Sequence, residues 1–423
     1  MKLVEQLKNR LMYPAAYTYI AWQSNLSKVK SWGKKDQVCF AQPYAGQKIM
    51  LMALYEKGCI RDDVVAAMNA ARALGVYVIG VNTLKLSSPD DYRDVMDCYI
   101  ERYNFGRDFG SYKSGFNYIY TQGLAEKCPR LLMINDSLFF SKKHMSVFLQ
   151  DMFISDIEVL GSTENFEIEH HLGSFCIAMS NSILNHKRLK NYWRGYKCSD
   201  IRPLVIKTGE MKLSKVLRGV VSRSEGFRSL YDTAHVAKVL KSNPAVLDGV
   251  ANLSRNSDLV DWPRFSFAAI VKAFGANYLY SSATIAGVSV NLEGSDLSVV
   301  NTQYARSVSE FENYICNSIS NSGAVGANLS AAIRDEVVAH FVDCFSRGSQ
   351  IHQSNAFLHK IGLPLIKLDG IYRGMFNSRD IERVADDLDA DQQEDFRRIM
   401  YSRPFGGVVL VGWKRAAFMR GLI

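Results

Sequence analysis

This chain of 423 residues lacks the sequence signals of several large protein classes. It has no uninterrupted apolar run of the roughly 18–20 residues that a membrane-spanning helix requires. Charged residues interrupt the apolar ones over residues 1–22, so the apolar core of a secretory signal peptide is missing there. Neither zinc-finger spacing nor an RNA-recognition aromatic motif occurs. These absences lead us to expect a cytoplasmic protein.

The cysteines also lack a pattern, because the eight of them are scattered and no two form a CxxC pair. Several, including Cys39 and Cys176, lie in apolar runs, where cysteine behaves as a small buried hydrophobic residue. We therefore expect reduced thiols in a cytosolic protein, with neither a zinc site nor a disulfide framework.

Charge gives a broader indication. The chain has 51 basic and 42 acidic residues, which gives a net charge of +9. Nucleic acid, an anionic membrane surface or a phosphate-bearing substrate could each explain this excess, and so could a merely basic solvated surface. Because the nucleic-acid motifs are missing, nucleic acid is the weakest of these partners.

Length and pattern predict an α/β protein with several parts. The chain exceeds the ~250–300 residues at which single cores stop growing. We expect an N-terminal helix and connector over 1–35 and an α/β domain over 36–230. A mainly helical region, which binds an acceptor or forms a homodimer, should occupy 231–345. A C-terminal segment, 346–423, should pack back on the α/β domain.

Strand and helix patterns alternate along the α/β domain. A buried strand over 37–45, a helix over 62–75 and a strand over 76–83 read as a βαβ unit, which predicts a mostly parallel sheet between helices. Further strands are expected at 130–136, 156–163, 174–181 and 201–207, and further helices at 114–127, 142–152, 183–196 and 210–219. Beyond the domain we expect a small β element at 283–301, a helix running into a strand at 354–369, and one charged helix at 380–400.

The first candidate site is a glycine-rich stretch over 103–115, just after a strand. Glycine lets a backbone approach a ligand closely, aspartate can receive ribose hydroxyls, arginine can pair with phosphate, and an aromatic ring can stack on a base. The stretch is neither a Rossmann motif nor a P-loop, and a glycine-rich turn before a helix explains it equally. Its candidate donor-binding residues are Asn104, Gly106, Arg107, Asp108, Gly110 and Tyr112.

The second candidate site is the triplet Asn135, Asp136 and Ser137, at the carboxyl end of an apolar strand. In open parallel sheets the ligand crevice lies outside such strand ends. A carboxylate there can hold a divalent cation that neutralises a diphosphate. A strand-end Asx turn is the structural alternative.

Candidate acids and bases follow further along the chain. Glu210 stands where we expect a helix to start after a strand, so it is either a general base or a carboxylate favoured by the helix dipole. Glu164 is the second candidate base. His352 could reach a diphosphate or metal, and Lys367 a diphosphate, although a structural histidine and a salt bridge explain them as well.

Five segments together resemble the rhamnan-synthesis F family of bacterial polysaccharide assembly proteins. They are NFGRDFGSYKSG, INDSLFF, LGSTEN with HHLGSFCIAMS, GEMKLSKVLRG, and SQIHQSNAFLHKIGLPLIKLD. The resemblance covers most of 37–230 and returns at 345–375. It implies a glycosyltransferase A-type fold (a Rossmann-like, mostly parallel sheet sandwiched by helices) with a largely helical C-terminal region. It also implies a nucleotide-diphosphate sugar as donor.

The same resemblance implies roles for individual residues. A DxD-like motif in such folds binds Mg²⁺ or Mn²⁺, but here Asp136 is the sole carboxylate of the triplet, with His352 as a second candidate metal ligand. In related inverting transferases an acid before a Leu-rich helix is the base, which would be Glu210, although Met211 stands where a second acid is expected. His170 and His171 would contact the acceptor or the donor, although a partly exposed pair of loop residues explains them as well.

Together these implications predict an inverting hexosyltransferase of surface-polysaccharide synthesis, whether of O-antigen, capsule or rhamnan. Rhamnose, another hexose or galactofuranose would pass to a lipid-linked or oligosaccharide acceptor. The positive charge is compatible with peripheral contact with the inner membrane or with other assembly enzymes. A non-catalytic protein that binds glycans or nucleotide sugars is the alternative, because the acid pairs are incomplete.

Overall fold

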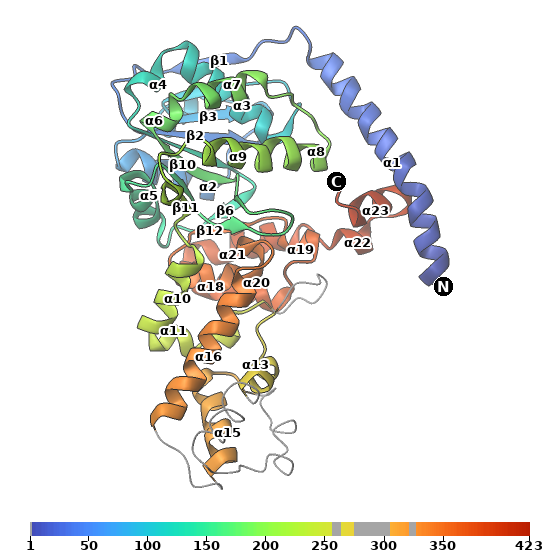
Figure 1. The fold of residues 1–423 in the computed structure, drawn as a ribbon. Helices are drawn as coiled ribbons and strands as arrows, with labels where there is room; N and C mark the ends of the chain where they lie inside the picture. Colours follow the sequence, from blue (N-terminus) through green and yellow to red (C-terminus); the bar gives the residue numbers. More distant parts are fainter. Residues whose placement is uncertain (1, 256–263, 275–304, 321–326) are drawn as a thin grey trace.

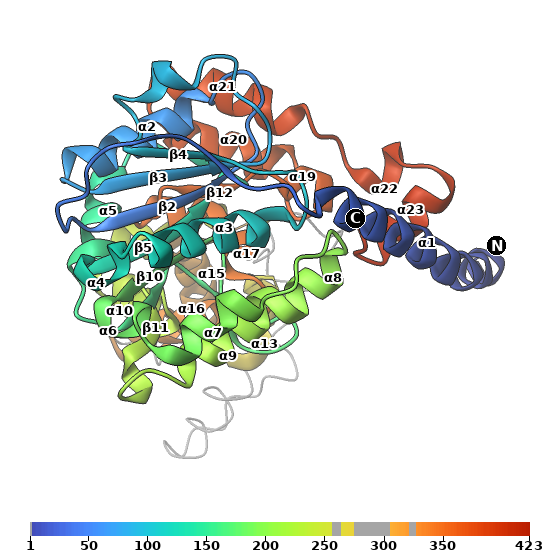
Figure 2. The same ribbon diagram turned by 90° about the horizontal axis from the view of Figure 1, so that it is seen from above.

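The computed structural model describes residues 2–255, 264–274, 305–320 and 327–423 (Figure 1). An α/β body carries the sheet, and helices of the middle of the chain extend from one end of it. A pair formed by the first helix and the last helices stands out to one side of the body (Figure 2).

The body is built on an eight-stranded sheet in the order β1-β4-β3-β2-β5-β10-β7-β11. Neighbours among β4, β3, β2 and β5 are parallel, and so are β7 and β11, whereas β1 on β4 and β10 on both β5 and β7 are antiparallel. Every residue of β2, β3 and β5 is buried, as expected for strands covered on both faces. The bounds are β1 Gln37–Ala41, β2 Ile49–Leu54, β3 Tyr77–Asn82, β4 Cys98–Glu101, β5 Arg130–Asn135, β7 Val159–Gly161, β10 Cys176–Ser180 and β11 Phe227–Ser229.

Helices cover both faces of this sheet. Apolar residues of α3 (Arg107–Thr121), α7 (Lys187–Gly195) and α9 (Lys212–Arg218) form one core with it. Those of α2 (Asp62–Ala73) and α5 (Met145–Ile154) form the core on the other face. The predicted α/β class, a mostly parallel sheet between helices followed by a largely helical C-terminal region, is therefore confirmed. Shorter elements of the body are η1 Pro89–Tyr92, α4 Leu124–Lys127, β8 Glu164–Asn165, β9 His171–Leu172, α6 Asn181–Leu184 and η3 Ser224–Gly226.

Three predictions of local structure were wrong. The parallel crossover through α2 starts from β2, a strand that the sequence pattern did not predict, and not from 37–45. The predicted strand at 201–207 is helical, because α8 (Arg202–Val205), with Pro203 in its first turn, continues through a π-helical turn (Ile206–Met211) into α9. The predicted charged helix at 380–400 is two helices, α20 (Ser378–Asp387) and α21 (Ala390–Tyr401).

The middle of the chain is helical wherever the structure describes it. Apolar residues of α10 and α16 belong to the same core as α2 and α5, so this region continues the body's packing. Its elements are α10 Thr233–Ser242, α11 Pro244–Asp248, α12 Val250–Leu253, α13 Phe267–Phe274, α15 Val308–Ser320 and α16 Ala327–Phe345. The β element predicted at 283–301 lies outside the described residues.

The chain then returns to the body. Strand β12 (Leu365–Lys367) pairs antiparallel with β6 (Leu138–Phe140), which follows β5. The helix running into a strand at 354–369 is thereby confirmed as α18 (Asn355–Lys360) and β12. This return brings residues 349–373 beside the carboxyl end of β5. Helices α17 Gln350–Gln353, α19 Gly370–Arg373, α22 Gly406–Val409 and α23 Gly412–Met419 complete the segment.

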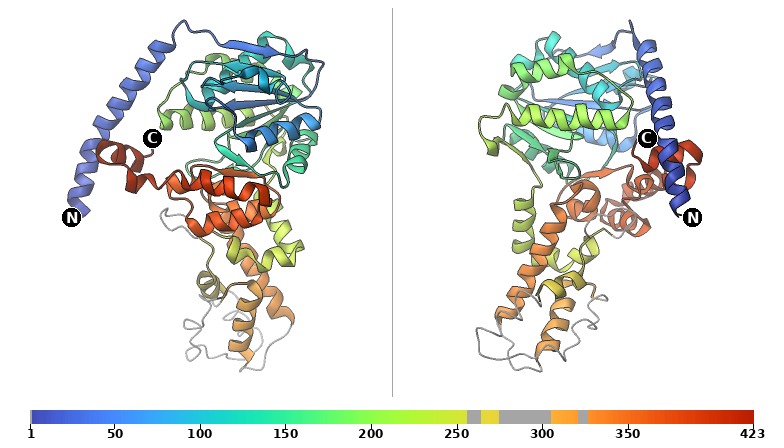
Figure 3. Two further views of the ribbon diagram at one scale, coloured as in Figure 1. Left: turned by 180° about the vertical axis from the view of Figure 1, so that it is seen from behind. Right: turned by 45° about the vertical axis from the view of Figure 1, so that its right-hand side comes forward.

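Helix α1 (Lys2–Ser31) packs against α23, so the two ends of the chain lie side by side (Figure 3). Ala16 and Ile20 of α1 share a small apolar core with Ala417 and Leu422. Among the described residues, no helix has both the length and the apolar composition needed to cross a membrane.

Candidate functional site

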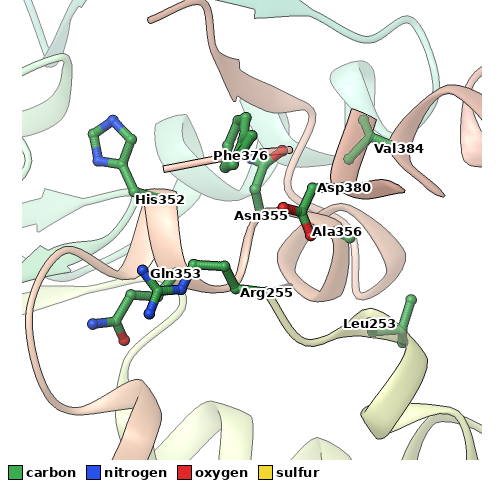
Figure 4. A pocket seen from close by; sticks show the side chains of 9 residues that line it. All are labelled: Leu253, Arg255, His352, Gln353, Asn355, Ala356, Phe376, Asp380 and Val384. Atoms are coloured by element: carbon green, nitrogen blue, oxygen red, sulfur yellow. The ribbon is translucent and has the colours of Figure 1, made fainter. Parts of the chain in front are cut away.

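A cleft of about 960 Å³ opens at the carboxyl end of β5. Its walls come from the start of α3, the loop after β5, residues 163–175, the helical run from α8 to the π-helical turn, and the returning segment from Ser349 to Met375. Residues Phe405 and Phe418–Gly421 also line it. A second cavity that His352 also lines has a volume of only about 10 Å³ (Figure 4), too small for a sugar nucleotide. Two other cavities among the described residues have volumes of about 520 and 330 Å³, so the cleft is the largest of the four. We therefore place the candidate site in the large cleft.

One chain of hydrogen bonds joins three parts of the sequence across this cleft. Asn135 Nδ2 donates to Asp108 Oδ2 (2.9 Å), and Ser137 Oγ donates to Asn135 Oδ1 (2.6 Å). Lys367 Nζ donates to Ser137 Oγ (3.1 Å). The glycine-rich stretch, the strand-end triplet and the C-terminal segment thus meet at one place.

Lys367 is one of the cations that line the cleft. Its Nζ lies 4.3 Å from the centre of the Phe175 ring, a cation–π contact. Burial lowers the pKa of Lys367, while the nearby carboxylates of Asp369, Glu210 and Asp108 raise it. An ammonium surrounded in this way is suited to hold an anionic group such as a diphosphate.

Asp108 lies at the start of α3, where it lines the cleft beside Arg107. Burial raises the pKa of Asp108, and the charges of Lys367, Arg107 and Arg102 oppose that rise. Arg107 itself is exposed, with φ of 51°, and its Nε donates to the carbonyl oxygen of Asp200 (3.1 Å). The carboxylate and the guanidinium are therefore both available to a ligand in the cleft.

Glu210 lies on the opposite wall, in the π-helical turn between α8 and α9. Such turns occur frequently at functional sites because they displace one residue from the regular helix. Gly209 lets this turn approach the ring of Phe109, since a Cβ there would lie 3.0 Å from ring carbons. The prediction that Glu210 starts a helix after a strand was wrong, although its side chain does line the cleft.

A histidine accompanies this carboxylate. Nε2 of the buried His171 lies 3.8 Å from Glu210 Oε2. His171 Nδ1 donates to the carbonyl oxygen of Glu169 (2.7 Å), which orients the ring with Nε2 toward Glu210. His171 Nε2 thus faces the glutamate at a distance longer than a hydrogen bond.

The second candidate base, Glu164, also lines the cleft but is more enclosed. Its Oε1 lies 3.1 Å from His170 Nε2, and only 11% of its side chain is exposed, compared with 29% for Glu210. His170 does not line the cleft; its ring stacks on Phe166, and its Nδ1 is 2.8 Å from Arg218. Accessibility therefore favours Glu210 over Glu164 as a base.

His352 lines the cleft within the returning segment. Its Nδ1 is 2.9 Å from Ser349 Oγ, and its Nε2 is 3.3 Å from Asp369 Oδ1. Burial alone would raise the pKa of Asp369, but the hydrogen bond and charge of His352, together with Lys367 and Arg373, hold this pKa well below its usual range. His352 thus belongs to a charged cluster with Lys367 on one wall.

Several residues of the glycine-rich stretch do not line the cleft. The ring of Tyr112 is fully buried against Phe109 and Trp193, and its hydroxyl donates to the Ser174 carbonyl (3.3 Å), so it is not available to stack on a base. A Cβ at Gly106 would lie 2.6 Å from Cys198 Cβ, and one at Gly110 would lie 2.6 Å from the Phe105 oxygen. These glycines permit close packing within the protein, and Asn104 is exposed away from the cleft lining.

Asp136 also turns away from the cleft. Its carboxylate accepts a hydrogen bond from the backbone N–H of Tyr55, and burial raises its pKa to about 8. Among the described residues, no group of three or more His, Cys, Asp or Glu side chains could hold a metal ion. Asp136 and His352 are not part of such a group, and a metal ion held by them stays a prediction.

Arg202, Arg373 and Phe175 are among the cleft-lining residues that the sequence did not indicate. Arg202 lies in the segment that was predicted as a strand, so its place at a helix start was not recognised. Arg373 follows Asp369 by four residues and pairs with it at 3.3 Å, a spacing that a helical assignment of residues 369–373 would have revealed.

Part of the region that forms this site is similar to a family of known proteins. Residues 76–256 match the model of the family described as Rhamnan synthesis protein F. The match contains Asp108, Asn135, Glu164, His171 and Glu210, and it confirms the resemblance that the sequence motifs predicted. The last of those motifs, at 349–369, lies beyond the matched range.

Two curated relatives and one solved structure show weaker similarity. The virulence protein VirA of Vibrio anguillarum is 31% identical over 149 residues, which are 35% of this chain and 45% of VirA. The uncharacterized protein y4gN of Sinorhizobium fredii is 24% identical over 198 residues, 45% of this chain and 50% of that protein. The chain thus spans about half the length of the curated relatives it matches. The crystal structure of the glycosyltransferase GlyE in Streptococcus pneumoniae TIGR4 aligns with 47% of this chain and with 50% of the GlyE chain, at 11% sequence identity. The TM-score of this alignment is 0.26, which is too low to support a structural relationship.

Proposed function

We propose that this protein is a glycosyltransferase of surface-polysaccharide synthesis that moves a sugar from a nucleotide-diphosphate donor to a glycan acceptor with inversion. The observation that carries the proposal is the cleft that holds Asp108, Lys367 and Glu210 together, on opposite walls. One wall offers hydroxyl- and phosphate-binding groups, and the other a carboxylate base. The family match supports polysaccharide synthesis as the setting.

In the proposed reaction, Glu210 accepts the proton of the acceptor hydroxyl as that oxygen bonds to the anomeric carbon. The bond from the anomeric carbon to the donor phosphate breaks, and its electron pair leaves with the nucleotide diphosphate. Because attack and departure occur on opposite sides of the carbon, the configuration inverts. His171, 3.8 Å from Glu210, positions the carboxylate and is not itself in the transfer step.

The leaving diphosphate requires positive charge, and the cleft supplies it. Lys367, Arg202 and Arg373 line the cleft, and fixed cations aimed at developing negative charge stabilise the transition state. Asp108, held by Asn135, is placed to accept hydrogen bonds from donor hydroxyls. No step of the proposed reaction uses a metal ion on Asp136, because its carboxylate accepts a hydrogen bond from the Tyr55 backbone N–H.

The test is a mass-spectrometric screen of nucleotide-sugar donors, with release of free nucleotide as the readout. The screen begins with deoxythymidine-diphosphate rhamnose and continues with hexopyranose and galactofuranose donors. For the donor that reacts, Glu210→Gln should abolish transfer and leave donor affinity nearly unchanged. Glu167→Gln is the matched control, because Glu167 lines the same cleft but is exposed. Full activity of folded Glu210→Gln protein would remove the proposed base.

A non-catalytic protein that binds nucleotide sugars is the second candidate. Met211 follows Glu210 at the position where related inverting transferases have a second acid, and Asp136 does not line the cleft. This site therefore has fewer acidic side chains available for catalysis than those transferases. Such a protein would bind donor in calorimetry and release no nucleotide with any acceptor. Turnover with any donor excludes this candidate.

A further inference from the structure

Helix α1 carries a stripe of exposed large apolar side chains. Tyr19, Trp22, Leu26 and Val29 recur at spacings of three and four residues, which places them along one face of the helix. Trp22 is 56% exposed and Val29 is 64% exposed. A soluble surface seldom aligns such residues, so the stripe is a candidate contact surface.

Apart from Tyr19, the packing of α1 against the rest of the protein does not use this stripe. The opposite face, with Ala16, Ile20 and Ser24, is the buried one. Ala16 and Ile20 join the small core with α23, and Ser24 Oγ accepts a hydrogen bond from the Asp200 N–H (3.1 Å). Helix α1 therefore has two apolar faces, and the fold covers one.

The stripe continues onto the C-terminal helices. The rings of Tyr19 and Trp413 meet edge to face, with centroids 5.0 Å apart. Just before Trp413, Val408 and Val411 are 75% and 77% exposed. Two segments from opposite ends of the chain thus meet at this ring pair, and both expose apolar side chains on the part of the molecule that stands out beside the body (Figures 2 and 3).

Both segments that form this surface carry basic side chains and no acidic ones. Residues 13–35 and 402–423 contain no Asp or Glu. Their cations are Lys28, Lys30, Lys34, Lys35, Arg403, Lys414, Arg415 and Arg420. We call the exposed apolar residues named above, together with these cations, the α1/α23 surface.

We propose that the α1/α23 surface binds an anionic lipid membrane, with α1 lying in the plane of the interface. Tryptophan and tyrosine favour the headgroup level of a bilayer, and aliphatic residues between them can enter the acyl boundary. Lys and Arg side chains near an anionic leaflet are attracted to its negative surface potential. Charge complementarity thus favours lipid as the occupant. A second copy of this chain would oppose two surfaces of the same positive sign, which repel each other.

The α1/α23 surface lies next to the cleft, so membrane docking would bring the cleft close to the lipid. Phe418 to Gly421, at the end of α23, line the cleft that contains Glu210. Arg202 donates to the Gly421 carbonyl (3.3 Å) and Arg373 to that of Ile423 (2.6 Å), so two cleft arginines hold this end in place. Docking would bring the cleft mouth to the lipid surface, where a lipid-linked acceptor resides. This last step rests on the proposed function, whereas the docking itself does not.

The experiment measures binding of the purified full chain to vesicles, without donor or acceptor. Vesicles of phosphatidylglycerol and phosphatidylethanolamine are compared with vesicles of phosphatidylcholine alone, by flotation. We expect the chain to float with the anionic vesicles, and with salt-sensitive affinity, and to remain unbound with the neutral ones. No binding to either kind overturns the proposal.

Variants distinguish binding through the α1/α23 surface from nonspecific binding to vesicles. The double variant Trp22→Ser with Val29→Ser should weaken binding at least tenfold, and so should Lys28→Glu with Lys30→Glu. The matched controls are Val147→Ser, an exposed valine on α5, and Lys241→Glu, an exposed lysine on α10. All four should unfold at the temperature of the parent protein, because the altered side chains are exposed.

Two further outcomes decide against the proposal. Equal loss of binding in the controls would assign binding to overall charge and hydrophobicity. A dimer in solution that Trp22→Ser with Val29→Ser converts to a monomer would assign the surface to a second copy. Vesicle binding by a protein that transfers no sugar would leave the docking intact and remove the proposed function alone.

Discussion

Asn135, at the end of β5, donates its side-chain amide to the carboxylate of Asp108, at the start of α3 (2.9 Å). The two residues are 27 positions apart, and each belongs to a motif that the sequence indicated separately. Asn135 Oδ1 in turn accepts a hydrogen bond from the Ser137 hydroxyl, so both the nitrogen and the oxygen of the amide are hydrogen-bonded. This bond fixes Asp108 in one orientation toward the cleft.

Asn135→Ala should weaken donor binding about tenfold, which corresponds to about 1.4 kcal/mol, because Asp108 loses the partner that orients it. Calorimetric titration with the reactive donor measures the effect. Asn104→Ala is the control, since Asn104 is exposed and does not line the cleft. Equal affinities of both variants and the parent would show that Asp108 does not contact the donor.

Lys367→Met should lower kcat about 100-fold with a smaller change in KM, because a fixed cation acts mainly on the charge that develops on the leaving diphosphate. Initial rates over a range of donor concentrations separate the two constants. Lys207→Met is the matched control, a lysine on the wall that carries Glu210. A rise in KM alone would limit Lys367 to ground-state binding.

Asp136→Asn should change how stability depends on pH. Burial raises the pKa of Asp136 from 3.8 to about 8, so the folded protein keeps its proton where the unfolded chain has lost it. The parent's stability should therefore fall as the pH rises from about 4 to about 8 and level off above that. The variant, which does not titrate, should gain melting temperature relative to the parent between about pH 5 and about pH 8.5. A constant difference across that range contradicts the shifted pKa.

Asp387→Asn should destabilise the protein at neutral pH by about 2 kcal/mol or more. Asp387 accepts from the fully buried His359 (2.7 Å), whose other ring nitrogen lies 3.0 Å from Ser141 Oγ, and it pairs with Lys143 and Lys360. Burial opposes ionisation of Asp387, but the hydrogen bonds from His359 and Lys143 hold its pKa well below its usual range. Its contribution is present above the ordinary carboxyl pKa and is lost as the pH falls through the folded pKa.

Chemical denaturation at about pH 7 and about pH 3 measures this difference, which should shrink at the lower pH. The exposed Asp386 of the same helix is the matched control, and Asp386→Asn should change stability by less than about 0.5 kcal/mol. Equal effects of the two substitutions would mean that the His359 bridge does not stabilise the return of the C-terminal segment to the body.

The sequence predicted those elements whose patterns are local. Strand β3 and helix α2 followed from a run of β-branched residues and from apolar residues at helical spacing. Strand β2, an apolar run of six, was missed, because a short apolar run has no periodicity that separates strand from loop or helix. Arg202 to Val205 were misassigned since an apolar, β-branched composition outweighed the proline that starts the helix.

For the site, the sequence alone determined which side chains have the required chemistry. The carboxylates Asp108 and Glu210, the amide of Asn135 and the ammonium of Lys367 are all identifiable from residue type and neighbouring motif. The tertiary structure alone decided which of them meet. It turned Asp136 toward Tyr55, buried Tyr112 behind the cleft and paired α1 with α23. These outcomes depend on packing between segments far apart in the chain, and the direction of a side chain is set by those neighbours and not by its own residue type.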